Sequence, residues 1–471
     1  MPNTQLAIIG GGPGGYVAAF KAVDAGLDVT LIDPEENPGG VCLYRGCIPS
    51  KALLHISKLI DETRQASEWG VKFGIPEINL DQLRAHKDNI IGKMTGGLGQ
   101  LVKARKLKHI RASAKFTDSK NLDLTLIDGK KESLTFDHAI VSTGSSPVMP
   151  EIFAINDERI MDSTSALELR EIPESMLIVG GGIIGMELGQ VYAALGSSIS
   201  VAEMMPGLIP PADRDLVKPL EGHLKSQFKN IWVNTKLTGV SPTAEGISVE
   251  LQAPNNHTFT QNFSSILVSV GRYPNSSNVG IENTNIELDD RGYIKVDSQM
   301  RTAESSIFAI GDVIGAGLAH TASHQGTVVA EILSGHEKLV FEPRAIPSVV
   351  YTNPEIAWCG LTEQQANEQE IDCKVARFPW SASGRATAVG CNEGLTKLLI
   401  DPVNDRILGV GISGNNAGEL IAEGVLAVEM AALASDIQLS IHPHPTLSET
   451  FMEAAEVYYG QSPHMYTPRR N

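Results

Sequence analysis

Two distant segments of the chain repeat one arrangement of apolar, glycine and polar positions. Each begins with an apolar run, passes through G-x-G-x-x-G into small and apolar residues, and ends its second apolar run on an acid; the copies are Leu6–Asp33 and Met176–Glu203. This pattern predicts a strand, a tight turn, a helix and a second strand in both places. We therefore expect two copies of a nucleotide-binding unit.

The glycines of each copy have separate physical roles. The first permits a tight turn, the second lets the backbone approach a pyrophosphate, and the third lets the helix pack closely on the strand. One such motif could serve packing alone, but two copies in the same context predict two bound dinucleotides. The glycines are Gly10, Gly12 and Gly15 in the first copy and Gly180, Gly182 and Gly185 in the second.

An acid closes each unit, Asp33 in the first and Glu203 in the second. A carboxylate at this position accepts hydrogen bonds from ribose hydroxyls and repels a 2'-phosphate. No arginine follows Glu203 before Arg214. The second site is therefore expected to favour NAD over NADP.

The remaining hydrophobic pattern divides the chain further. On each side of the second unit, a strand-like run leads into a glycine-containing segment where the chain can pass between domains. A later apolar strand that ends on Asp312 is expected to complete the first domain. Strand-like runs and then Ala- and Leu-rich helices near the C-terminus predict an α+β domain. The predicted fold is α/β, with two Rossmann-like domains and this third domain. Their boundaries are 1–150 with 276–346, 151–275, and 347–471.

Composition and charge narrow the function. A length of 471 residues suits about three domains with their own cores. The formal net charge of -17 argues against binding to nucleic acid or to an anionic membrane surface. The N-terminus has no basic segment, and no apolar run reaches about 18 residues, so we expect a cytoplasmic protein without a membrane anchor.

The stretch GGVCLYRGCIPSK places two of the five cysteines, Cys42 and Cys47, five positions apart. On a regular helix these positions differ by about 7.5 Å in rise and about 140° in direction, whereas a disulfide needs Cα atoms within about 7 Å. A bond therefore requires irregular backbone, which Gly46 and the preceding glycine pair can supply, while Pro49 can open the next helix. Two unreactive core thiols are the alternative. No metal site is expected, because a second ligand pair is missing.

The same stretch resembles the redox-active disulfide motif of the flavin-dependent pyridine nucleotide-disulfide oxidoreductases. The resemblance covers essentially the whole chain, through STG, GGGIIGMELG, VSVGRYPN, AIGD, LAH, PSVVYTNPEIAWCG and HPHPTLSE in this order. It implies FAD in the first dinucleotide site, NAD in the second, and a homodimer. In such a dimer, the C-terminal domain of one chain lies against the disulfide of the other.

The resemblance also implies roles for individual residues. Cys42 matches the thiol that exchanges with substrate, and Cys47 matches the thiol that faces the flavin. Lys51 and Glu187 match an ion pair beside the flavin and the nicotinamide. The residues expected to bind FAD are Gly10, Gly12, Gly15, Asp33, Lys51, Thr143, Gly144, Asp312 and Ala319. Those expected to bind NAD are Gly180, Gly182, Gly185, Glu187, Glu203 and Gly271.

In HPHPTLSE, His444 and Glu449 match an acid-base dyad that acts across the dimer. Histidine side chains titrate near neutral pH, so one can take a proton from a dithiol and return it, and a carboxylate can orient the ring. We interpret His442 as a surface histidine in a proline turn.

The ending IPSK is most similar to family members that oxidise dihydrolipoamide. The resemblance thus implies a dihydrolipoamide:NAD oxidoreductase that serves a lipoylated carrier of a 2-oxo acid dehydrogenase, glycine cleavage or other lipoate-dependent system. A glutathione-type or mercuric reductase is an alternative that IPSK and Glu203 disfavour. A non-catalytic redox-sensing subunit is suggested only by the departures from the family pattern around Val41. Together with the departures at Tyr44 and Arg45 and at Ala112 and Ala114, they leave the exact carrier open.

Overall fold

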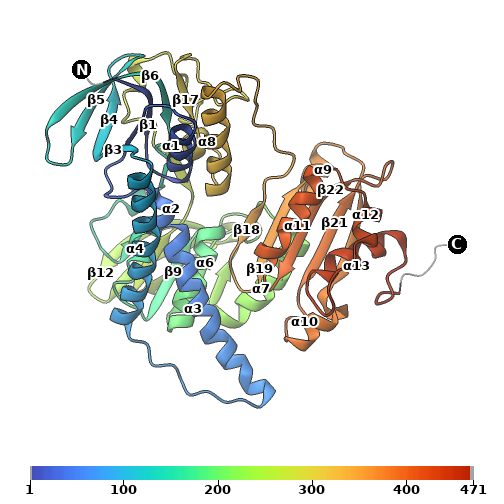
Figure 1. Ribbon diagram of the computed structural model, residues 1–471. Helices are drawn as coiled ribbons and strands as arrows, with labels where there is room; N and C mark the ends of the chain where they lie inside the picture. Colours follow the sequence, from blue (N-terminus) through green and yellow to red (C-terminus); the bar gives the residue numbers. More distant parts are fainter. Residues whose placement is uncertain (1–2, 467–471) are drawn as a thin grey trace.

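The computed structural model of the chain describes residues 3–466 and builds its first part around a seven-stranded sheet (Figure 1). Its order is β3 (Lys108–Ile110), β2 (Val29–Ile32), β1 (Asn3–Ile9), β6 (Lys131–Val141), β5 (Asn121–Leu126) and β4 (Ala112–Phe116). β17 (Ile307–Ala309) pairs in parallel with β6, so a much later strand completes the sheet. α1 (Pro13–Asp24) and α8 (Ala319–Leu333) lie side by side against it.

The second sheet is formed by parallel strands, in the order β11 (Asn230–Trp232), β10 (Ser198–Ala202), β9 (Ser175–Val179), β15 (Ser265–Val268) and β8 (Ile160–Met161). The repeated sequence pattern becomes β1-α1-β2 in the first sheet and β9-α6-β10 here, with α6 at Ile183–Leu195. Both predicted units are therefore present. A separate antiparallel sheet consists of β12 (Lys236–Thr243), β13 (Gly246–Gln252) and β14 (Thr258–Phe263).

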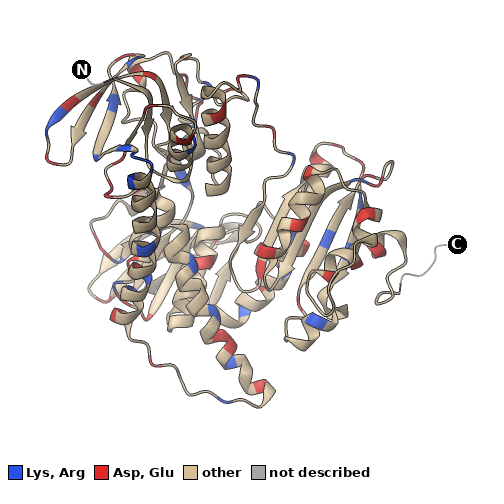
Figure 2. Ribbon diagram, in the orientation of Figure 1, with Lys and Arg blue, Asp and Glu red and all other residues tan. Residues whose placement is uncertain are grey.

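The third large sheet is antiparallel, in the order β18 (Ser348–Val350), β19 (Glu355–Gly360), β22 (Ile407–Gly414), β21 (Leu395–Ile400) and β20 (Lys374–Pro379). Its helices include α11 (Ala417–Glu429) and α13 (Glu449–Tyr459). Each of these two helices carries three glutamates and no lysine or arginine, and Figure 2 shows the acidic positions along them. The predicted α/β class with an α+β C-terminal part is confirmed, while the boundaries in residue numbers stay predictions.

One long helix, α3 (Cys47–Gln65), joins the first sheet to the second. It packs on α6 and on α4 (Leu80–Ala104), and its buried Leu53, Leu54 and Ile60 belong to the same apolar cluster as residues of α6. Burial of this shared face stabilises the arrangement. Among residues 3–466, no helix is long and apolar enough to cross a membrane.

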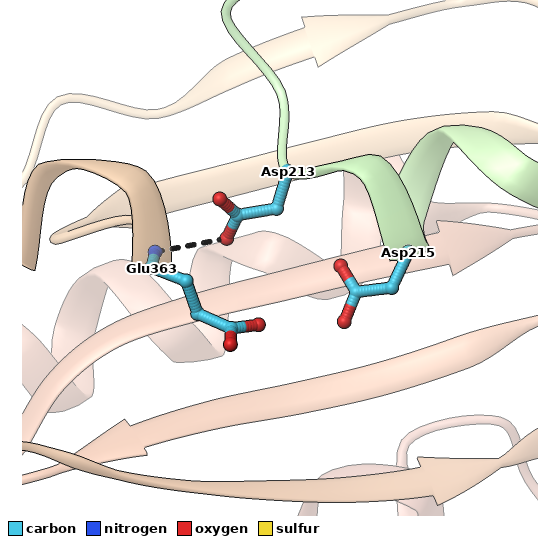
Figure 3. A group of neighbouring side chains, drawn as sticks. All are labelled: Asp213, Asp215 and Glu363. Carbon is cyan, nitrogen blue, oxygen red and sulfur yellow. Dashed lines mark hydrogen bonds between the residues drawn. The ribbon is translucent and has the colours of Figure 1, made fainter. Parts of the chain in front are cut away.

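A buried ion cluster connects the start of α7 (Arg214–Gln227) to the third sheet. Asp213, Asp215 and Glu363 lie close together (Figure 3), but the Nζ of Lys397 on β21 is 2.7–2.8 Å from a carboxylate oxygen of each. The ammonium group therefore occupies the centre of a cluster that could otherwise suit a metal ion. Burial alone would lower the pKa of Lys397, but the three carboxylates outweigh it and raise the pKa.

We predict that Lys397→Met lowers the free energy of unfolding by about 3–5 kcal/mol, because it leaves the buried Asp213 carboxylate without its ammonium partner. Urea unfolding followed by circular dichroism measures this change. Lys374→Met, at an exposed position on the neighbouring strand β20, is the control and should change stability by less than about 1 kcal/mol. Equal effects of the two substitutions would contradict the prediction.

Candidate active site

The two neighbouring cysteines lie at a break between two helices. α2 (Gly40–Arg45) ends before Gly46, whose φ of -142° and ψ of -111° interrupt the helix, and α3 then begins at Cys47. A Cβ at Gly46 would lie 2.9 Å from the carbonyl oxygen of Val41, so the break requires glycine. The prediction that Pro49 opens the helix was wrong, because α3 begins two residues earlier, at Cys47. Proline fits inside the first turn because the amide groups there need no helical partner.

The two thiols share a hydrogen bond. The hydrogen bond from Cys42 and the nearby Lys51 ammonium lower the pKa of Cys47 to about 7, although partial desolvation opposes this shift. The same hydrogen bond and burial raise the pKa of Cys42. Of the two thiols, Cys47 is therefore the one that loses its proton first. By contrast, burial raises the pKa of Cys359 to about 12.

The sequence-predicted ion pair forms next to these cysteines. Lys51, one turn after Cys47 on α3, donates to Glu187 Oε2 on α6 at 2.9 Å. Glu187 is only 3 % exposed, and its Oε1 accepts a hydrogen bond from the backbone N–H of Tyr351 at 2.9 Å. The Tyr351 ring centroid lies 4.5 Å from the Lys51 Nζ. Tyr351 had no predicted role, because nothing in its local pattern marks it.

The first glycine loop has the expected geometry. Gly10 has a φ of 104°, and a Cβ there would lie 2.2 Å from the carbonyl oxygen of Ser142. A Cβ at Gly15 would lie 1.9 Å from the carbonyl oxygen of Gly10, so helix and strand need glycine for their close packing. At Gly12 the nearest atom to a Cβ is 4.0 Å away, which leaves space for a phosphate at the helix N-terminus.

The second loop repeats this arrangement. Gly180 has a φ of 105°, and a Cβ at Gly185 would lie 2.3 Å from the carbonyl oxygen of Gly180. A Cβ at Gly182 would meet nothing within 4 Å. Both loops therefore fit a dinucleotide pyrophosphate on physical grounds.

Each closing acid is attached to its own loop. Asp33 Oδ2 accepts from the Gly11 N–H at 2.6 Å, and Glu203 Oε2 accepts from the Gly181 N–H at 2.5 Å. Carboxylate oxygens have further lone pairs, so both groups can still accept from ribose hydroxyls.

The other predicted cofactor residues follow the carboxyl ends of parallel strands, where open α/β sheets bind ligands. Thr143 and Gly144 follow β6, Gly271 follows β15, and Asp312 follows β17. Asp312 Oδ2 accepts a hydrogen bond from Ser145 Oγ at 2.5 Å. Ala319 is the first residue of α8. Of the predicted residues, Thr143, Gly144, Gly271 and Asp312 thus lie just beyond the carboxyl ends of strands, in the first or the second sheet.

His444 and Glu449 form a pair at the start of α13. His444 Nδ1 lies 2.8 Å from Glu449 Oε1, while Glu449 Oε2 accepts from the Thr446 N–H at 2.7 Å. The His444 side chain is 78 % exposed. Figure 1 shows α13, which Glu449 begins, on the opposite side of the chain from α2, so the fold of one chain does not bring this pair to the cysteines.

The interpretation of His442 as a surface histidine was wrong. Its side chain is only 7 % exposed, with Nε2 2.7 Å from Glu423 Oε1 and Nδ1 2.9 Å from the Ser440 carbonyl oxygen. The glutamate comes from α11, which the local sequence around the histidine could not indicate.

Comparison with known proteins identifies the family of this chain. The family model "Pyridine nucleotide-disulphide oxidoreductase" matches residues 4–326, and the "Pyridine nucleotide-disulphide oxidoreductase, dimerisation domain" model matches residues 346–455. The chain is therefore a pyridine nucleotide-disulphide oxidoreductase. Membership of this family implies a flavin dinucleotide and a pyridine nucleotide as cofactors, and confirms the resemblance inferred from the motifs.

Individual relatives of this oxidoreductase match over nearly their whole length. A dihydrolipoyl dehydrogenase of Haemophilus influenzae is 45% identical, with 97% of this chain and 95% of the relative covered. The dihydrolipoyl dehydrogenase of Thermus scotoductus is 41% identical, with 99% of this chain and 99% of the relative covered. The crystal structure of LpdA from Mycobacterium tuberculosis matches with a TM-score of 0.88 and 26% identity, covering 96% of this chain and 99% of that chain.

We predict that Cys47 becomes a thiolate near neutral pH. In the reduced protein freed of dinucleotides, its alkylation rate should rise with a midpoint near the pKa of about 7. Lys51→Met should move this midpoint upward by roughly 1 unit, because the ammonium favours the thiolate. Iodoacetamide labelling with peptide mass mapping gives the rate for Cys47 alone. Lys58→Met on the same helix is the control; a shift as large as that of Lys51→Met would contradict the role of the Lys51 charge.

Proposed function

We propose that this oxidoreductase is a dihydrolipoyl dehydrogenase, which oxidises the dihydrolipoyl group of a carrier protein and transfers a hydride to NAD. The main support is the redox pair Cys42–Cys47 beside the Lys51–Glu187 ion pair, between two dinucleotide loops. The nearly full-length similarity to proteins named dihydrolipoyl dehydrogenase favours this substrate over glutathione or mercuric ion.

In this proposal the first sheet binds FAD and the second binds NAD. The FAD residues are Gly10, Gly12, Gly15, Asp33, Lys51, Thr143, Gly144, Asp312 and Ala319, and the NAD residues are Gly180, Gly182, Gly185, Glu187, Glu203 and Gly271. FAD, when bound, couples the oxidation of the dithiol to the transfer of a hydride. NAD is favoured over NADP because the buried Glu203 carboxylate would repel a 2'-phosphate.

The chain's own residues carry out the thiol exchange. His444 takes the proton of one substrate thiol, and the resulting thiolate attacks Cys42 Sγ. The Cys42–Cys47 bond breaks, and Cys47 leaves as a thiolate that the neighbouring Lys51 ammonium stabilises. The second substrate thiol then attacks the substrate sulfur bound to Cys42. This step releases the substrate as a cyclic disulfide; the proton of the second thiol passes to the Cys42 sulfur, and the first proton stays on His444.

The proposed reaction requires a homodimer, because α13, which Glu449 begins, lies on the other side of the chain from α2 (Figure 1). A two-fold dimer through the dimerisation domain would place His444 of each chain at the disulfide of its partner. We also propose a cytoplasmic location, where such carriers and NAD are present together.

We predict that Cys47→Ser and His444→Gln each abolish more than about 99 % of dihydrolipoamide oxidation by NAD, since neither retains the exchange chemistry. Chains that carry Cys47→Ser and chains that carry His444→Gln, when mixed, unfolded together and refolded, should regain activity. Random pairing makes about half of the dimers mixed, each with one intact site, so about a quarter of the wild-type rate is expected.

Cys373→Ser, at a lone half-buried cysteine, is the control and should keep the wild-type rate. Loss of activity in the single variants without recovery on mixing would contradict the cross-dimer placement of His444. Full activity of Cys47→Ser would contradict the whole route. NADH formation followed by absorbance measures every case.

A further inference from the structure

Gln190 is a buried polar residue that the proposed reaction does not use. It lies on α6, three residues after Glu187 and thus on the same face, and is 2 % exposed. Its Oε1 accepts from the Asn353 N–H at 2.7 Å, and its Nε2 donates to the Asn353 carbonyl oxygen at 2.8 Å. One side chain therefore binds both backbone groups of one residue, as a neighbouring strand would.

The residue that Gln190 holds is next to the ion pair. Asn353 follows two positions after Tyr351, whose N–H donates to Glu187 and whose ring lies beside the Lys51 ammonium. Glu187 and Gln190 therefore bind the same segment at two adjacent points, and the position of Tyr351 depends on both.

The helix that carries Lys51 is attached at the same place. Ser57 Oγ on α3 donates to the Gln190 carbonyl oxygen at 3.1 Å. Gln190 Nε2 also donates to Gln227 Oε1 at 3.0 Å, and Gln227 Nε2 donates to Asp61 Oδ2 on α3 at 2.8 Å. Ser57 and Asp61 are 4–5 % exposed, so water does not readily replace these bonds.

We propose that Gln190 is a positioning residue for the redox centre. By fixing the segment 351–353 against α6 and α3, it places the Tyr351 N–H and ring, and through them the Lys51–Glu187 pair relative to Cys47. It acts through Glu187 and touches neither substrate nor cysteine. Its effect on turnover rests on the proposed function, whereas its effect on the cysteine pair does not.

A double-mutant cycle tests whether Gln190 acts through Glu187. In the FAD-loaded enzyme, Gln190→Leu should lower kcat for dihydrolipoamide oxidation about tenfold, with KM for dihydrolipoamide changed less than about twofold. In a Glu187→Gln background, the same substitution should change kcat by less than about twofold, since the group it positions is already altered. Equal factors in both backgrounds would overturn the proposal.

A matched control separates positioning from stability. Tyr192→Phe removes a buried hydrogen bond from the same helix, to the Ala166 carbonyl oxygen at 2.7 Å, without touching the segment 351–353. It should lower the Tm while leaving kcat unchanged. If Tyr192→Phe lowers kcat as much as Gln190→Leu does, the effect reflects helix stability and the proposal fails.

A second measurement does not need turnover. The FAD-loaded enzyme is equilibrated with dithiothreitol and its disulfide, acid-quenched, and labelled at free thiols. Gln190→Leu should need about three- to tenfold more dithiothreitol relative to its disulfide for half-reduction of Cys42–Cys47, because a misplaced Lys51 stabilises the thiolate less. An unchanged ratio would overturn the proposal. If the wild-type enzyme fails to oxidise dihydrolipoamide while Gln190→Leu still shows this shift relative to it, only the proposed function is rejected.

Discussion

The buried carboxylate of Glu187 is the constraint on which the rest of the site depends. A charged group out of contact with water destabilises a fold unless it has an opposite charge and hydrogen-bond donors. Here the donors are the Lys51 ammonium from α3 and the Tyr351 N–H at the end of β18. Three separate parts of the chain must therefore meet at this one group. Cys47 lies one turn from Lys51, so its distance from the second dinucleotide loop is set by the same requirement.

A second buried ion cluster has the same effect between other parts. Lys397 draws the start of α7 onto the C-terminal sheet through Asp213 and Asp215. Apolar contacts also join these regions, but burial of apolar surface is non-directional and tolerates sliding. Ion pairs and the hydrogen bonds around Gln190 specify which residues must lie opposite one another. In this chain, polar contacts select the register of elements that the apolar core holds together.

The physical chemistry of the cysteine pair also depends on its surroundings. Two thiols at a helix break could equally be inert, and Cys359 shows how burial alone keeps a thiol protonated. Cys47 differs because Cys42 donates to it and Lys51 lies on the same helix. The lowered pKa makes Cys47 a good leaving group in thiol-disulfide exchange. The two cysteines of one motif therefore differ chemically, because the pKa of Cys47 is lowered and that of Cys42 is raised.

Local patterns in the sequence were enough to predict the two β-α-β units, their glycine turns and the irregular backbone between the cysteines. These features depend only on near neighbours in the chain and on backbone conformations such as the positive φ of Gly10. The Lys51–Glu187 pair could be expected from the resemblance to a family, although each residue alone looked like an exposed helix position. Tyr351, Gln190 and the partner of His442 were decided only by the tertiary structure. Their contacts join residues far apart in the chain, and hydrophobic periodicity records which face of an element is buried, not which polar group lies opposite it.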